Sequence, residues 1–401
     1  MDKKQPQPGK ANGITRREFI RDGAIVAGGL AAGLGVGLGA ARSLGTEANK
    51  TRKVGKADPK TRSYNPNMEY RRLGKTGLWV SAVSLGGHWK KLPYKFGTDD
   101  FKKNRREVVG ACIESGINYV DACAGSEVLA YADALRGRRE KMYLGYSFYE
   151  HEMRNKEWQS AGKLLEGLDD LLGRAKLDYV DLWRITCYWE PSTDHTLAHE
   201  QAIVEALEKA RKAGKVRFTG ISTHKHDWVI RMIERYPEHI QVVVVPYTAG
   251  SKKAHSRVDP GGPAGWQAVP DGTSDYDESM VSVIDAVKKN DAGWFGIKPF
   301  ASGSIFKSLG PGSRGAVNPA TKDVDDERAR MTVRYILWNE ALTAAIPGMI
   351  TVEQVKNAAL AVTERRKFDV AEARRFEDVV EGMWANLPAD YQWLKQEWEW
   401  V

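Results

Sequence analysis

The sequence predicts an α/β fold in which eight strands alternate with eight helices and close into one (β/α)8 TIM barrel. Short apolar runs bounded by glycine or charged residues recur between Val80 and Ile346, as is typical of parallel strands buried on both faces. Amphipathic stretches separate these runs. The length of 401 residues allows one barrel or two ordinary domains, and the unbroken alternation favours the barrel.

The elements follow one another in a regular order. A short hairpin is expected to turn at Gly74 to Gly77. Strands are predicted at residues 80–85, 119–123, 142–146, 179–185, 216–221, 241–245, 294–297 and 343–346. Helices are predicted at residues 100–115, 126–135, 154–172, 196–213, 227–236, 277–289, 325–339 and 351–362.

Charge and composition divide the chain into four segments. Residues 1–62 hold 13 Lys and Arg against 5 Asp and Glu, which accounts for the whole net charge of +8, so the remaining 47 basic and 47 acidic residues balance. The folded part therefore offers no electrostatic footprint for nucleic acid. We predict an export signal over 1–41, a flexible tether over 42–67, the barrel over 68–365 and a C-terminal helical extension over 366–401.

The leader is basic at its start and then uncharged from Gly23 to Ala41, with Arg16 and Arg17 side by side before this run. It resembles a twin-arginine export signal, which implies a bacterial, periplasmic or otherwise extracytoplasmic protein that folds before export. A membrane-spanning helix is the alternative interpretation, and an uncleaved signal would act as an anchor. Three cysteines are too few for a disulfide framework.

Gly116 to Glu127 reads GINYVDACAGSE, and Arg71 to Ser81 reads RRLGKTGLWVS. The first resembles the signature G-x-N-x-x-D-T-A-x-x-Y-G-x-S-E of the aldo-keto reductase family, although it is three residues short. The second resembles the family's opening R-x-L-G-x-T-G-L-x-V-S. The resemblance covers residues 69–365 and implies a TIM barrel with NADP(H)-linked carbonyl reduction at the C-terminal ends of the strands.

In this family an aspartate, a tyrosine, a lysine and a histidine share the proton transfer to the carbonyl oxygen. Asp121 matches the aspartate, and the shortened loop leaves the tyrosine without a counterpart. Ser147 stands at the lysine position and Thr186 at the histidine position. Three of the four positions therefore lack the side chain that the family uses for proton transfer. Asp121 is expected to be solvated, to be hydrogen-bonded by Ser147 or Tyr146, or to have a raised pKa.

Three further residues are candidates for proton transfer. Tyr146 is the phenol nearest in sequence to the vacated site, although a packed aromatic side chain is the favoured interpretation. His88 and His224 follow the first and fifth strands and so lie at the same end of the barrel. No metal site is predicted.

The resemblance also implies cofactor positions. Ser222 and Thr223 match the pair that holds the nicotinamide amide, with threonine replacing asparagine. The adenosine-phosphate clamp is matched at its glycine, glutamine and asparagine, whereas Ile350 replaces its arginine, which weakens contact with a 2′-phosphate. The cofactor is NADP or NAD, and its predicted binding residues are Ser222, Thr223, Lys298, Gly348, Gln354 and Asn357.

Two long loops, 250–276 and 301–324, follow strands and are expected to cover a ligand or to be disordered. The extension carries Trp384, Trp393, Trp398 and Trp400, expected to seal the barrel wall or to contact a protein partner. The leading function is an exported oxidoreductase of the aldo-keto reductase type that acts on a small carbonyl or sugar-like ligand. The alternatives are a non-catalytic ligand-binding or partner-binding barrel, and a non-redox enzyme with Asp121 as general base beside His88 or His224.

Overall fold

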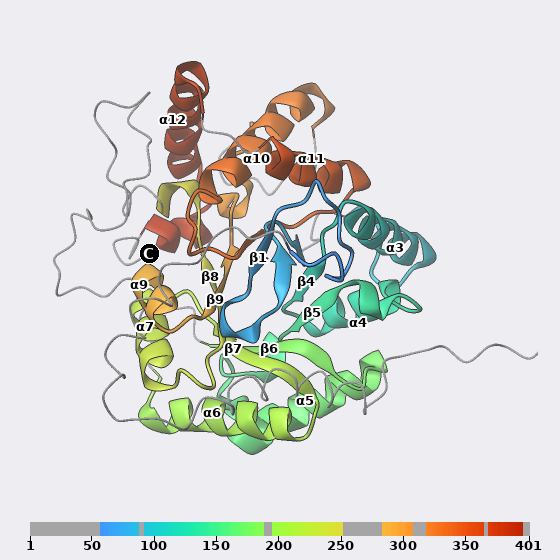
Figure 1. Ribbon diagram of the computed structural model, residues 1–401, viewed down its shortest axis with the longest axis vertical. Coiled ribbons are helices and arrows are strands. Elements are labelled where there is room, and N and C mark those ends of the chain that lie inside the picture. Colours follow the sequence, from blue (N-terminus) through green and yellow to red (C-terminus); the bar gives the residue numbers. More distant parts are fainter. Residues whose placement is uncertain are drawn as a thin grey trace, which may run out of the picture.

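The computed structural model describes residues 57–87, 92–187, 195–251, 283–307, 318–364 and 368–395. Its centre is a parallel sheet in which eight strands follow one another in sequence order (Figure 1). Isolated parallel bridges pair Val83 with Ala345 and Gly86 with Gly348. These bridges join the first barrel strand to the last, so the sheet closes and the predicted (β/α)8 barrel is confirmed.

The strands lie close to their predicted positions. They are β3 (Leu85–Gly86), β4 (Tyr119–Ala122), β5 (Tyr143–Tyr146), β6 (Val180–Thr186), β7 (Val216–Ser222), β8 (Val242–Pro246), β9 (Gly293–Ile297) and β10 (Ala344–Ile346). The helices around them are α3 (Asp99–Glu114), α4 (Gly125–Ala134), α5 (Ala161–Ala175), α6 (Leu197–Lys212), α7 (His226–Arg235), α9 (Val283–Lys289), α10 (Lys322–Ile336) and α11 (Val352–Thr363).

Two elements differ from the prediction for local reasons. The run 80–85 divides into the end of a hairpin strand and the start of β3, because Ser81 Oγ donates to the Val83 carbonyl at 2.7 Å and turns the chain. The helix expected from residue 154 begins at Ala161, where the Ser160 hydroxyl accepts the Lys163 N–H and caps it.

An antiparallel hairpin covers one end of the barrel. Its strands β1 (Tyr70–Arg72) and β2 (Trp79–Ser81) lie across the centre of the ring of helices in Figure 1. Leu73 and Val80 from this hairpin join the side chains of Tyr119 and Phe295 in an apolar cluster inside the barrel. The hairpin thus closes the N-terminal end, and the opposite end carries the strand carboxyl termini.

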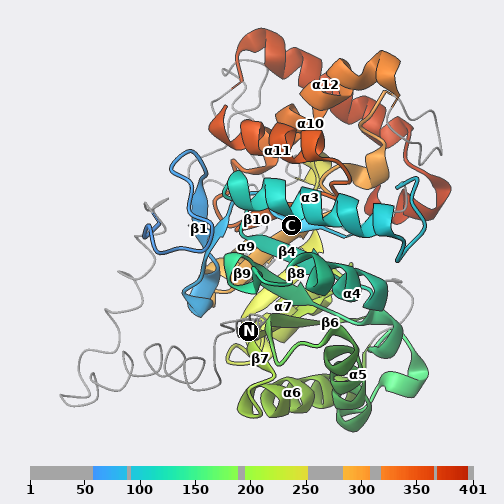
Figure 2. The ribbon, with the colours of Figure 1, turned by 90° about the vertical axis from the view of Figure 1, so that its right-hand side faces the viewer.

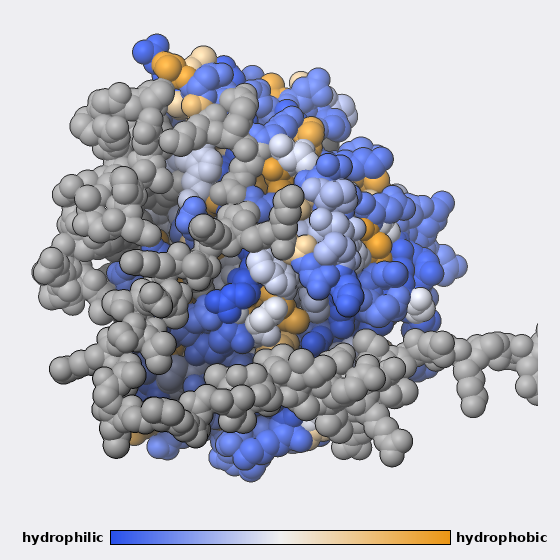
Figure 3. All heavy atoms as spheres, viewed as in Figure 1, coloured by the Kyte–Doolittle hydropathy of each residue, from blue (hydrophilic) through white to orange (hydrophobic). Residues whose placement is uncertain are grey.

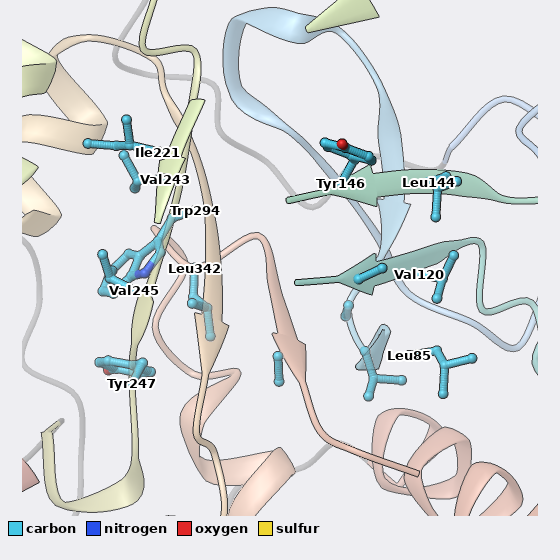
Figure 4. Packing of buried hydrophobic residues seen from close by; sticks show 14 of the residues in the cluster. Leu85, Val120, Leu144, Tyr146, Ile221, Val243, Val245, Tyr247, Trp294 and Leu342 are labelled. Carbon is cyan, nitrogen blue, oxygen red and sulfur yellow. The ribbon is translucent and has the colours of Figure 1, made fainter. Parts of the chain in front are cut away.

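A second and larger cluster fills the layer between the strands and the helices. Leu85, Val120, Leu144 and Tyr146 belong to it (Figure 4). Because successive strand residues point to opposite faces, the residues between these point into the barrel. This alternation decides which side chains can meet at the functional end.

Residues 57–67, predicted as part of the tether, lie against the barrel. Arg62 Nη1 donates to the Met142 carbonyl at 2.9 Å and faces Asp181 at 3.5 Å. Arg139 and Arg217 bind the same carboxylate at 2.7 and 2.8 Å. Burial opposes ionisation of Asp181, but the three guanidinium groups outweigh it and lower its pKa well below the usual range.

Hydrophilic side chains dominate the described part of the face of the molecule shown in Figure 3.

The C-terminal extension contains α12 (Val370–Ala385) and the 3-10 helix η9 (Ala389–Lys395). Asp369 and Glu372 form a capping box that starts α12. Figure 2 shows α12 beside α10 at one side of the barrel. None of the helices in the described ranges is both long and apolar enough to cross a membrane. The predicted leader and the first part of the tether lie outside these ranges.

Candidate active site

One half of the C-terminal end of the barrel is polar inside. Tyr119, Tyr143 and Leu182 belong to the inner cluster, so the residues two and four positions further along the same strands also face inward. These residues on β4, β5 and β6 include Asp121, Ser147, Arg184 and Thr186, and by the same alternation Ser222 faces inward at the end of β7. On β8, β9 and β10 the inward positions hold Val244, Ile297 and Ile346.

Asp121 is paired with an arginine that sequence reasoning missed. Arg184 Nε donates to Asp121 Oδ1 at 2.9 Å, and Arg184 Nη2 bonds the second carboxylate oxygen. Asp121 is 4% exposed and Arg184 is 2% exposed. Burial disfavours the charge on Arg184, but the carboxylate outweighs it and raises the pKa of the guanidinium. Asp121 is therefore not solvated, and it is not the unpaired carboxylate that a non-redox enzyme with Asp121 as general base would require.

Gly145 makes this pairing geometrically feasible. It lies on β5 between the two partner strands and pairs in register with Asp121 and with Leu182. A Cβ atom at this position would overlap the Tyr119 hydroxyl and would lie 3.0 Å from Asp121 Oδ1. The Tyr119 hydroxyl donates to Asp121 Oδ1 at 3.3 Å through that space. A strand residue without a side chain thus lets Arg184 reach across β5.

Ser147 and Thr186, which the resemblance matches to a lysine and a histidine, are bonded to each other. Ser147 Oγ lies 2.7 Å from Thr186 Oγ1, and it donates to Glu152 Oε2 at 2.5 Å. Three further donors bind the Glu152 carboxylate, at 2.7 to 3.0 Å: the backbone N–H groups of Phe148 and Thr186 and the indole N–H of Trp183. Arg184 Nη1 donates to Thr186 Oγ1 at 3.3 Å, which connects this network to the Asp121 pair.

Burial raises the pKa of Glu152, although its four hydrogen bonds act in the opposite direction. Glu152 lies six residues beyond the end of β5 in an irregular stretch, so no motif or periodicity pointed to it. Arg184 had a signal: it is a charged residue at an inward position of a buried strand, and such a residue requires a partner.

Tyr146 is not part of this site. It faces the helices, where its hydroxyl donates to the Gly167 carbonyl of α5 at 3.4 Å. Burial and then the Glu152 carboxylate raise its pKa well above the usual tyrosine range. Its candidacy as a replacement acid is corrected on this ground: strand alternation directs residue 146 outward and residues 145 and 147 inward.

The C-terminal extension lies across the ends of β7, β8 and β9. The Trp393 ring stacks on the imidazole of His224, with centroids 4.0 Å apart and planes 12° apart. Lys298 Nζ lies 5.5 Å from the centre of the Tyr391 ring. A Cβ atom on Gly250 would overlap the Trp384 ring. Two of the four predicted tryptophans, Trp384 and Trp393, therefore pack on the barrel end, and Trp398 and Trp400 lie outside the described residues.

The predicted cofactor residues fall into two groups. In the described part of the chain, the Ser222 hydroxyl has no hydrogen-bond partner, although the residue is 5% exposed. Thr223 is also buried beside it, and its hydroxyl accepts the Lys225 N–H at 3.2 Å. The Ser222 hydroxyl is not among the fully buried unpaired atoms of the described residues, so it can bind water or a ligand at the position where the resemblance places the nicotinamide amide.

At the adenosine-phosphate end the side chains bind the protein itself. Gln354 Oε1 accepts the Ile350 N–H at 2.7 Å, and Asn357 Oδ1 accepts from Arg330 at 2.7 Å. The carbonyl of Ile350 accepts from Arg105 Nη2 at 3.0 Å. Gly348 pairs with Gly86, where the two strands approach closely. The glutamine and the asparagine are thus engaged within the protein, and the Ile350 side chain supplies no cation.

His88 lies outside the described residues, as do residues 252–276 and 308–317 of the two long loops. Cys123 faces inward but carries a thiol whose pKa is raised well above the usual range by burial and then by Glu127. Cys112, Cys123 and Cys187 form no disulfide with one another. Within the described ranges, no group of three or more His, Cys, Asp or Glu side chains could hold a metal ion.

A (β/α)8 barrel with an aspartate at the end of its second strand defines a class with many enzymes. Residues 84–257 match the family model of the aldo/keto reductase family. The chain is 24% identical to L-galactose dehydrogenase of Arabidopsis thaliana over 316 residues, 74% of this chain and 89% of that protein. It is 30% identical to 6-dehydroglucose reductase of Novosphingobium aromaticivorans over 180 residues, 40% of this chain and 53% of that protein.

Solved structures agree on the fold. An aldo-keto reductase of Bacillus halodurans superposes with a TM-score of 0.51 and 20% identity, covering 78% of this chain and 96% of that one. An aldo/keto reductase of Klebsiella pneumoniae in complex with NADP and acetate gives 0.50 and 18%, covering 79% and 95%. Over residues 84–257 the chain is thus similar to the aldo/keto reductase family, and its curated relatives include oxidoreductases of that kind.

Proposed function

We propose that this protein is an exported oxidoreductase that reduces the carbonyl group of a small sugar-like compound with a nicotinamide cofactor. The observation that carries this proposal is the buried Asp121–Arg184 pair. It restores a cation beside the family's aspartate, where Ser147 has replaced the lysine. The site has therefore been rebuilt around Asp121 with a different partner.

Carbonyl reduction places negative charge on the substrate oxygen, and fixed donors stabilise that charge best in a buried site. Arg184 remains charged at any physiological pH and cannot give up a proton. It can therefore contribute charge and hydrogen bonds. Thr186, half-buried at the end of β6 and bonded to Arg184, adds a hydroxyl that can face the same oxygen.

A reduced nicotinamide, when bound, supplies the hydride for the carbonyl carbon. The unpartnered Ser222 hydroxyl fits its amide group. The Ile350 side chain offers no guanidinium for a 2′-phosphate, and the neighbouring Arg105 guanidinium donates to the Met349 and Ile350 carbonyl groups. NADH is therefore expected to bind at least as tightly as NADPH. Lys298 would reach a pyrophosphate after Tyr391 moves away from it.

A sugar-like substrate is supported by the names of the relatives, L-galactose dehydrogenase and 6-dehydroglucose reductase. Export is supported by the paired arginines and the uncharged run of the leader. Free nicotinamide nucleotide is expected to be scarce outside the inner membrane, so the cofactor would be carried with the folded protein. Nucleic acid is not proposed as a partner, because the charges outside the leader balance.

Titration of the purified full chain with NADH and NADPH, followed by nicotinamide fluorescence, tests the proposal. Saturable binding is expected, and Ser222→Ala should weaken it, whereas Ser126→Ala, on the exposed start of α4, should not. The absence of binding at about 1 mM of either cofactor, the upper end of ordinary Michaelis constants, would overturn it.

A second candidate is a barrel that binds its ligand without redox chemistry. It is favoured by Gln354 and Asn357, whose side chains are already bonded within the protein. This candidate predicts that sugars bind and that neither nicotinamide does. Asp121 as a general base is disfavoured, because the Arg184 guanidinium occupies both of its carboxylate oxygens.

A further inference from the structure

A chain of hydrogen bonds leads from a fully buried carboxyl group to the polar end of the barrel. Glu152, 1% exposed, binds Ser147 Oγ at 2.5 Å, and Ser147 lies 2.7 Å from Thr186 Oγ1. Ser147 is completely buried, whereas Thr186 is partly exposed at the strand end. Thr186 is therefore the outer end of the chain and Glu152 the inner end.

Counting hydrogens fixes the direction of this chain. Each hydroxyl group carries one proton and can accept others. When Glu152 is ionised, it is acceptor-only, so Ser147 donates to it and Thr186 must donate to Ser147. The Arg184 guanidinium then donates to Thr186 Oγ1. In this state Thr186 has no proton to offer to a ligand.

Protonation of Glu152 reverses the order. The carboxylic acid donates to Ser147, Ser147 donates to Thr186, and Thr186 directs its proton towards the space beyond the end of β6. Two hydroxyl rotations connect the two states, because no heavy atom has to move. The chain thus has two directions, and the proton on Glu152 selects between them.

We propose that Glu152, Ser147 and Thr186 form the proton route of this site, in place of the family's tyrosine, with Thr186 as the group that touches the substrate oxygen. This inference rests on the carbonyl reduction proposed above. Thr186 is the catalytic donor, and Ser147 and Glu152 act through it.

A reduced nicotinamide, if bound, would supply the hydride pair to the carbonyl carbon, and the electron pair of the C=O π bond would move onto oxygen. That oxygen takes the Thr186 proton, Thr186 takes the Ser147 proton, and Ser147 takes the proton of the Glu152 acid. The resulting carboxylate keeps the N–H donors of Phe148, Trp183 and Thr186. Water restores the proton through the same two hydroxyl groups.

The surroundings suit a group that changes its charge. The titratable groups that interact with Glu152 from neighbouring strands are the Tyr146 phenol of β5 and the Cys187 thiol after β6. Both are neutral near pH 7, since burial raises the pKa of each. The nearest cation in the network, Arg184, is joined through Thr186 and is neutralised by Asp121. No fixed charge in this set therefore locks Glu152 in its ionised form.

If Glu152 only stabilised the fold, it would make the same contacts but would remain ionised. Infrared difference spectroscopy of the full chain separates the two cases, because a protonated carboxyl group has its own C=O stretching band, and loss of that band in Glu152→Gln assigns it. The experiment follows this band with pH and after transfer into D2O. The variants are Ser147→Ala and Thr186→Val, with Ser126→Ala as the matched hydroxyl control.

The proposal predicts that the C=O band of protonated Glu152 appears as the pH is lowered, already at pH values above the usual pKa range of glutamate. It also predicts that this band shifts promptly after transfer into D2O. Ser147→Ala and Thr186→Val should slow this shift, and Ser126→Ala should leave it unchanged. Absence of the band at every pH at which the protein is folded would overturn the proposal, as would a D2O shift unaffected by either variant.

Failure of the wider function is seen separately, in the titration with NADH and NADPH. If the cofactor binds and galactose or glyceraldehyde is reduced, Ser147→Ala and Thr186→Val should lower turnover by about 100-fold, the usual contribution of a general acid. Unchanged turnover in both variants would contradict the proposed proton route without contradicting the proposed carbonyl reduction.

Discussion

Arg184 on β6 binds Asp121 on β4 through both carboxylate oxygens and crosses the intervening strand above Gly145. The pair lies at the end of the barrel that carries the strand carboxyl termini, where we propose that the reaction takes place. Although Ser147 stands where the resemblance places a lysine, the charge of Asp121 is balanced by Arg184, a group that cannot transfer a proton.

Replacing Arg184 with Met should destabilise the protein by about 3 kcal/mol, because Asp121 would remain buried without its cation. Denaturation in urea measures this change. The double variant Asp121→Asn with Arg184→Met should recover part of the loss. Arg174→Met, which removes the exposed pair with Asp170, should cost about 1 kcal/mol at most. Equal losses from both arginines would contradict the account.

Gly145→Ala should also destabilise the barrel, by about 2 kcal/mol, because its methyl group has no space beside Tyr119 and Asp121. Thermal unfolding tests this. The control is Gly173→Ala in α5, where a Cβ atom meets nothing within 4 Å. That change should be neutral or stabilising by up to about 1 kcal/mol. A tolerated alanine at position 145 would show that Arg184 does not need the gap.

The three arginines around Asp181 give a pH dependence of stability. Its folded pKa lies below the usual aspartate range, so the unfolded chain takes up a proton first as the pH falls. The advantage of wild type over Asp181→Asn should be complete above the usual range and should decline as the pH falls through it towards the folded pKa. Unfolding free energies from pH 7 downward, measured in both proteins, test this sign. A constant difference would refute it.

Trp393→Ala should strengthen cofactor binding. The Trp393 ring stacks on His224, and Tyr391 of the same segment lies against Lys298, so η9 lies against residues at the barrel end where the cofactor is proposed to bind. A segment that must move first reduces the apparent affinity. Fluorescence titration with NADH measures the change, and Phe96→Ala, which removes an exposed ring, is the control. Weaker binding in Trp393→Ala would mean that the ring supports the site instead.

The fold was predictable because its signals are local. Apolar strand runs, helix periodicity and the hairpin glycines each identify an element without knowledge of the rest of the chain. The division of residues 80–85 was less accessible, since it depends on the Ser81 hydroxyl and its bond to a backbone carbonyl.

The site was predictable only in part. Asp121 follows from its motif, and the outward direction of Tyr146 follows from strand alternation once the register is known. Arg184 required knowing which face of β6 is inward and that Gly145 leaves a gap. Glu152 comes from an irregular segment, so its approach to Ser147 and Thr186 is set by tertiary packing that no sequence spacing encodes.

Transfer of deuterium from labelled NADH to the carbonyl carbon of a sugar tests the central claim most directly. The full chain would be incubated with NADH deuterated at the transferable position and with galactose, glucose and glyceraldehyde in turn, and the products analysed by mass spectrometry. The account predicts one deuterium on the new carbinol carbon of at least one product, strongly reduced in Thr186→Val. Bound NADH with no deuterium in any product would contradict it.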